Sequence, residues 1–81
     1  MLSRSKAERA MRLKIGRKIK RRCHISAVRA SKEILPYLKI IFKNNANMAV
    51  GLAKWLDLEP EMIEYLAGTK KKAEVITQLI G

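Results

Sequence analysis

Apolar residues recur at intervals of three and four along nearly the whole chain, and this periodicity constrains the fold more than any other feature. No segment alternates apolar and polar residues over the run of about four to eight positions that marks a half-buried strand. Glycine and proline are few and lie mostly where one apolar-periodic segment gives way to the next. We therefore predict an all-α fold, a single compact bundle of about five helices over residues 1–81.

The first predicted helix, over residues 4–22, is long and strongly basic. Ser3 or Ser5 is its expected N-cap. Its apolar positions follow one another at four-residue intervals: Ala7, Met11, Ile15, Ile19 and Cys23. Because such a track forms only a narrow slanted seam, the helix must pack on the rest of the domain or on a partner to be stable. We expect Gly16, in the helix interior, to allow a close helix crossing.

A second helix is predicted over residues 27–43, with Ser26 as its N-cap. Its apolar positions cover a broad arc, which makes it the central core helix: Ala27, Val28, Ala30, Ile34, Leu35, Tyr37, Leu38, Ile41 and Phe42. Pro36 falls on the polar side of this helix, where water can satisfy the carbonyl that loses its partner. We therefore expect a kink at Pro36 rather than the end of the helix.

Three shorter helices are predicted, over residues 47–57, 58–68 and 70–80. Asparagines within residues 43–47 suit a turn and the N-cap of the helix that follows. Pro60 suits the first turn of the next helix, and Gly68 suits the position after its end. The helix over residues 47–57 is apolar nearly all round. Such a helix is either buried on several sides or exposes an apolar face to a partner.

The net charge of +11 is concentrated in residues 1–22, which hold ten Lys or Arg and one acid. A segment of this kind indicates contact with a polyanion, and a heavily solvated helix surface is the alternative. The candidate contacts with DNA phosphates are Arg12, Lys14, Arg17, Lys18, Lys20, Arg21 and Arg22. No aromatic or amide side chain accompanies them, so we expect this binding to be non-specific. The run of lysines at residues 70–72 is either a second basic patch or a solvated helix start.

Residues 52–68 have the apolar spacing of a helix-turn-helix unit. The would-be recognition helix, however, carries Glu59, Glu61 and Glu64 and no Lys or Arg. Three carboxylates would be repelled by the phosphates that border the major groove. We therefore interpret this segment as two short helices packed at a corner, without sequence-specific reading of DNA.

No catalytic or metal-binding constellation is found in the sequence. The chain has one cysteine and one histidine, adjacent at Cys23 and His24, whereas a zinc site needs about four ligands. We expect Cys23 to be a small core residue and His24 to lie in a surface turn. A phosphate-binding GxxxxGK[ST] loop is also missing. We therefore predict no catalytic residue, no metal and no cofactor in this chain, and no enzymatic activity of its own.

Contact with a membrane is not expected either. No stretch approaches the roughly 20 apolar residues of a membrane span, and no continuous apolar run follows the basic N-terminus, as a secretory signal requires. The seam of the first helix lacks the Trp or Phe that interfacial helices bury. We expect a cytoplasmic protein.

Four short segments in a fixed order carry a resemblance to a known family: "SKAER" at the start of the first helix, "HIS" at the break after it, "IIFKNN" at the end of the second, and "YLAG" closing the fourth. An apolar helix lies between the third and fourth of these segments. Together, residues 5–72 resemble the C-terminal collar domain of the large subunit of archaeal replication factor C. Members of that family are sliding-clamp loaders of the AAA+ class.

The resemblance implies that this chain is a fragment of a longer one, a single collar or oligomerisation domain over residues 1–81. In the family, ATP and Mg²⁺ bind to other domains, the collars join the subunits, and the assembly loads the sliding clamp onto primer–template DNA. The implied partners are the clamp-loader small subunits, with DNA through non-specific phosphate contacts of the basic helix. The sliding clamp would be contacted only through the longer parent protein.

We therefore predict a subunit-assembly domain of a DNA-replication clamp loader. The candidate interface residues are Met48, Val50, Leu52 and Trp55, because tryptophan is common where interfaces gain most of their energy. An ordinary core position remains the alternative for Trp55. The alternative function is a stand-alone helical domain that binds nucleic acid non-specifically through its basic helix.

Overall fold

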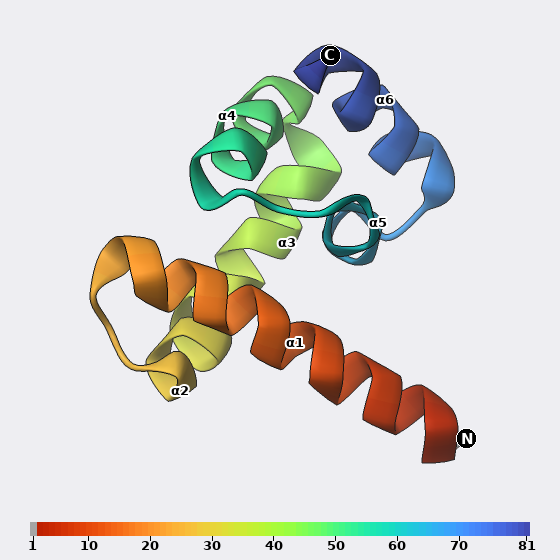
Figure 1. The fold of residues 1–81 in the computed structure, drawn as a ribbon. Helices are drawn as coiled ribbons and strands as arrows, with labels where there is room; N and C mark the ends of the chain where they lie inside the picture. Colours follow the sequence, from red (N-terminus) through yellow and green to blue (C-terminus); the bar gives the residue numbers. More distant parts are fainter. Residues whose placement is uncertain (1) are drawn as a thin grey trace.

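The computed structural model describes residues 2–81, and side chains from residue 6 onward. All its elements are helical, and the described part of the chain contains no strand, which confirms the all-α prediction (Figure 1). The elements are α1 (Leu2–Cys23), α2 (Ala27–Arg29), the π-helical turn η1 (Ala30–Ile34), α3 (Leu35–Asn44), α4 (Ala46–Leu56), α5 (Pro60–Ala67) and α6 (Lys70–Ile80). Within residues 2–81, no helix is both long and apolar enough to cross a bilayer.

Local capping residues set most of the helix boundaries. The Asn45 side chain accepts a hydrogen bond of 3.1 Å from the Met48 N–H and so begins α4, as the asparagine-rich turn predicted. Ser26 caps α2 in the same way. Gly68 follows α5 with φ of 87°, the left-handed conformation that favours glycine after a helix. The predicted start of α1 is wrong, because the helix begins at Leu2 and already includes both candidate serines.

The predicted second helix is continuous but not uniform. Its middle turn, η1, is a π-helix in which the Leu35 N–H bonds to the Ala30 carbonyl, five residues back. Pro36 comes next and is exposed, as predicted. The proline ring would clash with the carbonyl four residues earlier in an α-helix. The wider turn relieves that clash, so the expected irregularity at Pro36 takes the form of a π-helical turn rather than a simple kink.

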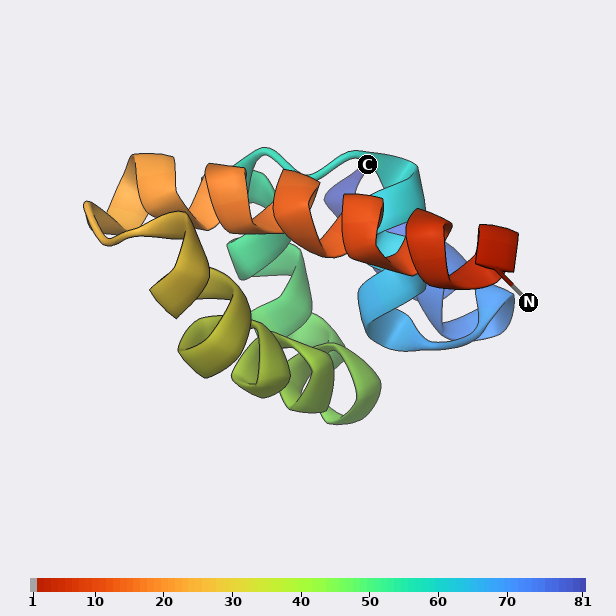
Figure 2. The ribbon, with the colours of Figure 1, turned by 90° about the horizontal axis from the view of Figure 1, so that it is seen from below.

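One apolar core joins all the long elements. It consists of Ile15 and Ile19 from α1, Ala30 from η1, Leu35, Leu38 and Phe42 from α3, Ala49, Ala53 and Leu56 from α4, Met62, Ile63, Leu66 and Ala67 from α5, and Ala73 and Ile76 from α6. In Figure 1, α3 runs from the end formed by α1 and α2 toward the end formed by α4 and α6. Figure 2 shows α1 lying across the other helices. α3 therefore connects the two ends of the molecule.

Four apolar residues that periodicity placed in the core are exposed. Ala7 is exposed in the N-terminal half of α1, the half that projects from the rest of the molecule in Figure 1. Cys23 is the last residue of α1, where the chain turns away, so its predicted core role is wrong. Val28 and Tyr37 are exposed because the π-helical turn adds a residue between them, and positions on its two sides no longer share the face that α-helical spacing predicts.

The predicted close crossing at Gly16 is only partly observed. Gly16 is buried against the start of the second helix. A Cβ added there would lie 3.5 Å from the Ala27 carbonyl oxygen and 3.8 Å from the Ser31 Cβ, which are ordinary contact distances. The crossing at this point therefore does not require glycine.

Candidate functional site

An exposed apolar face runs along α4. Met48 and Trp55 are 52% and 47% exposed, and Gly51 is exposed between them. Leu52 is half-buried on the same face, because residues three, four and seven apart line up on an α-helix. The other side of α4 supplies the buried core residues. The all-apolar helix therefore exposes a face, and Trp55 is not a core residue. We call Met48, Gly51, Leu52 and Trp55 the α4 stripe.

Val50 does not belong to the α4 stripe. It is half-buried and packs against the core. At about 100° per residue, its side chain leaves α4 about 200° from that of Met48. The structure thus brings together three of the four predicted interface residues and directs the fourth elsewhere.

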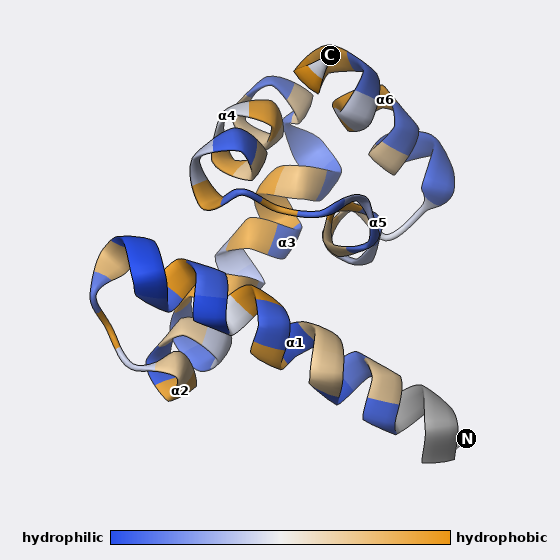
Figure 3. Ribbon diagram, in the orientation of Figure 1, coloured by the Kyte–Doolittle hydropathy of each residue, from blue (hydrophilic) through white to orange (hydrophobic). Residues whose placement is uncertain are grey.

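Most of the predicted phosphate contacts on α1 are exposed to solvent: Arg12, Lys14, Arg17, Lys20, Arg21 and Arg22. Hydrophilic residues dominate the last turns of α1 in Figure 3. Lys18 differs, because its side chain is only 17% exposed and its Nζ lies 2.6 Å from the Asp57 carbonyl oxygen. The same Nζ lies 3.8 Å from Asp57 Oδ2 and 4.0 Å from Glu59 Oε2. Lys18 therefore ties α1 to the turn between α4 and α5.

Sequence reasoning missed a basic groove where α1 crosses η1 and the start of α3. A hollow of about 240 Å³ is lined by Arg9, Arg12, Leu13, Ser31 and Lys32. An adjoining hollow of about 160 Å³ is lined by Arg12, Ser31, Leu35, Pro36 and Lys39. We call these residues together the basic groove. Its cations come from two helices, so no single basic run in the sequence indicates it.

Other charged side chains are engaged within the fold. Arg29 Nε donates to Glu33 Oε2 at 2.7 Å, and this hydrogen bond, with the carboxylate charge, raises the pKa of Arg29. Lys72 Nζ donates to the Lys43 carbonyl at 3.1 Å, next to the end of α3. One member of the lysine run at residues 70–72 thus contacts the fold, and the other two are exposed at the start of α6.

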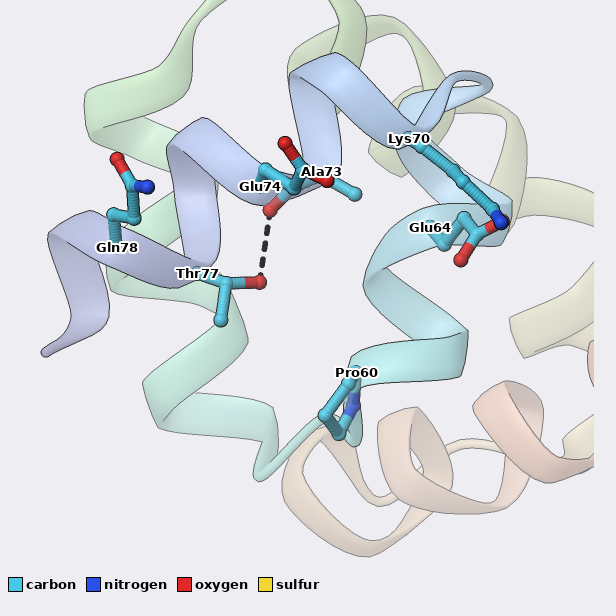
Figure 4. Close-up of a pocket in the computed structure, with 7 residues that line it drawn as sticks. All are labelled: Pro60, Glu64, Lys70, Ala73, Glu74, Thr77 and Gln78. Carbon is cyan, nitrogen blue, oxygen red and sulfur yellow. Dashed lines mark hydrogen bonds between the residues drawn. The ribbon is translucent and has the colours of Figure 1, made fainter.

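The hollow between α5 and α6 has no catalytic arrangement. It measures about 260 Å³ and is lined by Pro60, Glu64, Lys70, Ala73, Glu74, Thr77 and Gln78 (Figure 4). The Thr77 hydroxyl donates to the Ala73 carbonyl at 2.8 Å, and both glutamates are exposed. No group of three His, Cys, Asp or Glu side chains suited to a metal ion occurs in the described residues. His24 lies in the exposed turn after α1, as predicted.

The structure gives no support for α5 as a helix that reads DNA. Its face toward the molecule is buried in the core, and its acidic residues are exposed. α4 and α5 both contribute side chains to the same core, but they pack mainly against α3 and α6, so the predicted packing of these two helices on each other is not observed.

Comparison with known proteins gives a consistent set of relatives. The chain is 37% identical over 76 residues to the replication factor C large subunit of Thermococcus kodakarensis, covering 94% of the chain and 15% of that protein. It is 36% identical over 75 residues to the protein of the same name from Pyrococcus horikoshii, covering 93% of the chain and 16% of the relative. The large subunit of Methanococcus aeolicus is 36% identical over 80 residues, 99% of the chain and 17% of the relative.

No protein-family model matches the chain, and no solved structure matches it significantly. The chain spans about one sixth of the length of the curated relatives it matches, in their C-terminal region. The expected resemblance is thereby confirmed: along nearly its whole length, this chain is similar to the C-terminal region of archaeal replication factor C large subunits.

Proposed function

We propose that this chain is the subunit-assembly, or collar, region of a DNA-replication clamp loader, and that the small subunits of the loader are its partners. The similarity to replication factor C large subunits supports this proposal. ATP hydrolysis with Mg²⁺ and contact with the sliding clamp are then the work of other regions of the longer protein. This chain's contribution is to hold subunits together.

The observation that carries the proposal is the α4 stripe. It exposes Met48 and Trp55 about one helical turn to either side of Gly51 and Leu52, and none of its four residues is charged. Large apolar side chains that line up on one exposed face are typical of protein interfaces. Trp is also enriched at positions that contribute most to binding. The stripe therefore offers a partner helix a continuous apolar surface.

The proposal is tested by size exclusion with light scattering, on the chain mixed with clamp-loader small subunits from the same organism. We expect a co-eluting complex, and we expect Met48→Ala/Trp55→Ala to weaken it by at least about a hundredfold, the effect of losing two central anchors. Val75→Ala/Leu79→Ala is the matched control, because both residues are large, apolar and half-exposed on α6.

The outcomes separate clearly. Loss of the complex in the α4 variant, with retention in the α6 variant, supports assembly through the α4 stripe. Equal loss in both variants argues against that surface. Separate elution of the folded wild-type chain and folded small subunits argues against assembly by this region altogether.

A second proposed function is accessory, non-specific contact with DNA. Eight exposed cations in the described part of α1 and the net charge of +11 support it. Such charge attracts a phosphate backbone and gives binding that weakens steeply with salt. If this chain failed to assemble with small subunits but bound DNA, it would act as the stand-alone nucleic-acid-binding domain that was the alternative expectation.

A further inference from the structure

We propose that the nucleic-acid backbone is bound in the basic groove, between α1 and the η1–α3 segment, rather than along the outer face of α1. This inference rests on the DNA contact proposed above and specifies its site. The cations concerned are Arg9, Arg12, Lys32 and Lys39, of which only Arg12 lies among the contacts expected from the sequence.

The first argument is convergence of charge. The two hollows of the groove share Arg12 and Ser31, so they lie side by side. Cations on the outer face of a single helix point radially apart. In the groove they approach one chain of phosphates from two walls, and field strength is greatest in such clefts. No acidic side chain lines either hollow.

The second argument is that these cations are available. No ion pair involves any of the four among the residues that the structure describes. Glu33, which lies on η1 next to Lys32, is held by Arg29 at 2.7 Å. Lys39 Nζ lies 4.7 Å from the centroid of the Tyr65 ring, a contact that positions the ammonium without neutralising it.

The third argument is the backbone that forms the groove. Ser31 and Lys32 belong to η1, and π-helical turns occur frequently at functional sites. Ser31 also lies near Gly16 of α1, where a Cβ added to the glycine would be 3.8 Å from the Ser31 Cβ, so α1 and η1 are in contact beside the groove. One wall of the groove is therefore formed in part by an irregular turn.

The lining also indicates which part of the nucleic acid is bound. The groove has no aromatic side chain to stack on bases and no amide side chain to read their edges. Its apolar walls, Leu13, Leu35 and Pro36, include none of the Trp or Phe that interfacial helices insert into lipid. The four cations of the groove match backbone phosphates, and without an amide or aromatic side chain beside them we expect affinity to depend little on base sequence.

The test measures fluorescence anisotropy of a labelled duplex DNA of about 20 base pairs, titrated with the chain at several salt concentrations. The groove variant is Arg9→Gln/Arg12→Gln/Lys32→Gln/Lys39→Gln. The control is Lys14→Gln/Arg17→Gln/Arg21→Gln/Lys54→Gln, which removes the same charge, two Arg and two Lys, from exposed positions outside the groove. We expect the groove variant to bind at least about tenfold more weakly than the control, and its salt slope to fall by about 3.

Two further measurements separate the loss of phosphate contacts from the loss of folded structure. Circular dichroism and thermal unfolding report whether each variant is folded. The charge-conserving variant Arg9→Lys/Arg12→Lys/Lys32→Arg/Lys39→Arg should retain the wild-type salt slope, because each phosphate contact keeps its cation. A folded charge-conserving variant that binds as poorly as the groove variant would argue against phosphate contacts in the groove.

Each remaining result has one meaning. Equal losses in the groove and control variants would show that net charge alone governs binding and would overturn the groove. Binding to acidic phospholipid vesicles but not to DNA would overturn nucleic acid as the occupant. A wild-type chain that binds no DNA would overturn the DNA contact itself. Assembly with small subunits is measured separately on the same variants, so its failure is distinguishable.

Discussion

Single residues set how the basic helix is attached to the fold, and Lys18 is the clearest case. It is one of seven clustered cations, yet its ammonium is directed to the turn after α4 rather than to solvent. Its partner, Asp57, is 39 residues away in the sequence, and Asp57 has a positive φ of 58°. No local pattern distinguishes Lys18 from Lys14 or Lys20, so its role was not predictable from the sequence.

We predict that Lys18→Ala lowers the free energy of unfolding by about 1 kcal/mol, whereas Lys14→Ala changes it by less than about 0.5 kcal/mol. Most of the loss is the hydrogen bond to the Asp57 carbonyl, because both carboxylates are largely exposed and their attraction is screened. Urea unfolding measures both changes. The Lys18 effect should persist in about 1 M salt, and its disappearance there would mean that the ion pairs dominate.

At the scale of elements, helix ends were predicted better than helix faces. The bounds of α6 agree with residues 70–80, and the Thr69 side chain caps this helix by accepting a hydrogen bond from the Lys72 N–H. The predicted buried face was wrong at Val28 and Tyr37, which are exposed because a π-helical turn lies between them. Pro36 indicated an irregularity but not its form, and η1 also packs against α1, a contact that the sequence does not show.

We predict that Asn45→Ala costs about 1 kcal/mol of unfolding free energy, because it removes the acceptor for the Met48 N–H at the start of α4. Asn47→Ala, two residues later on an exposed position inside the helix, should be neutral or slightly stabilising. Thermal unfolding of the two variants and the wild type makes the comparison. Equal effects of both substitutions would contradict a capping role for Asn45.

For the whole molecule, α3 is the element on which the others converge. α1, α4 and α5 all pack on it, and Phe42 is among the largest fully buried side chains. The same convergence explains the candidate sites. Met48 and Trp55 could be predicted as interface residues because α4 is apolar nearly all round. The basic groove could not be predicted in this way, because it forms only where α1 and η1 lie side by side. That proximity follows only from the tertiary structure.

We predict that Phe42→Ala lowers the free energy of unfolding by about 3–5 kcal/mol. That is a large part of what a domain of this size possesses, because folded domains have only about 0.05–0.15 kcal/mol per residue. Tyr37→Ala, an aromatic on the same helix that is exposed, should change it by less than about 0.5 kcal/mol. Chemical denaturation followed by circular dichroism gives both values. A loss below about 1 kcal/mol at Phe42 would mean that α3 is not the centre of the core.

The exposure of Cys23 and Trp55 has a practical consequence for studying this chain. Each is the sole residue of its type in the sequence, and both side chains reach solvent. Trp55 lies on the α4 stripe, and Cys23 lies at the end of the basic helix. The intrinsic emission of the indole would therefore respond to a partner subunit, and a thiol-coupled dye would respond to contacts made at the end of α1. The native sequence thus already carries two independent spectroscopic reporters, one on the α4 stripe and one at the end of the basic helix.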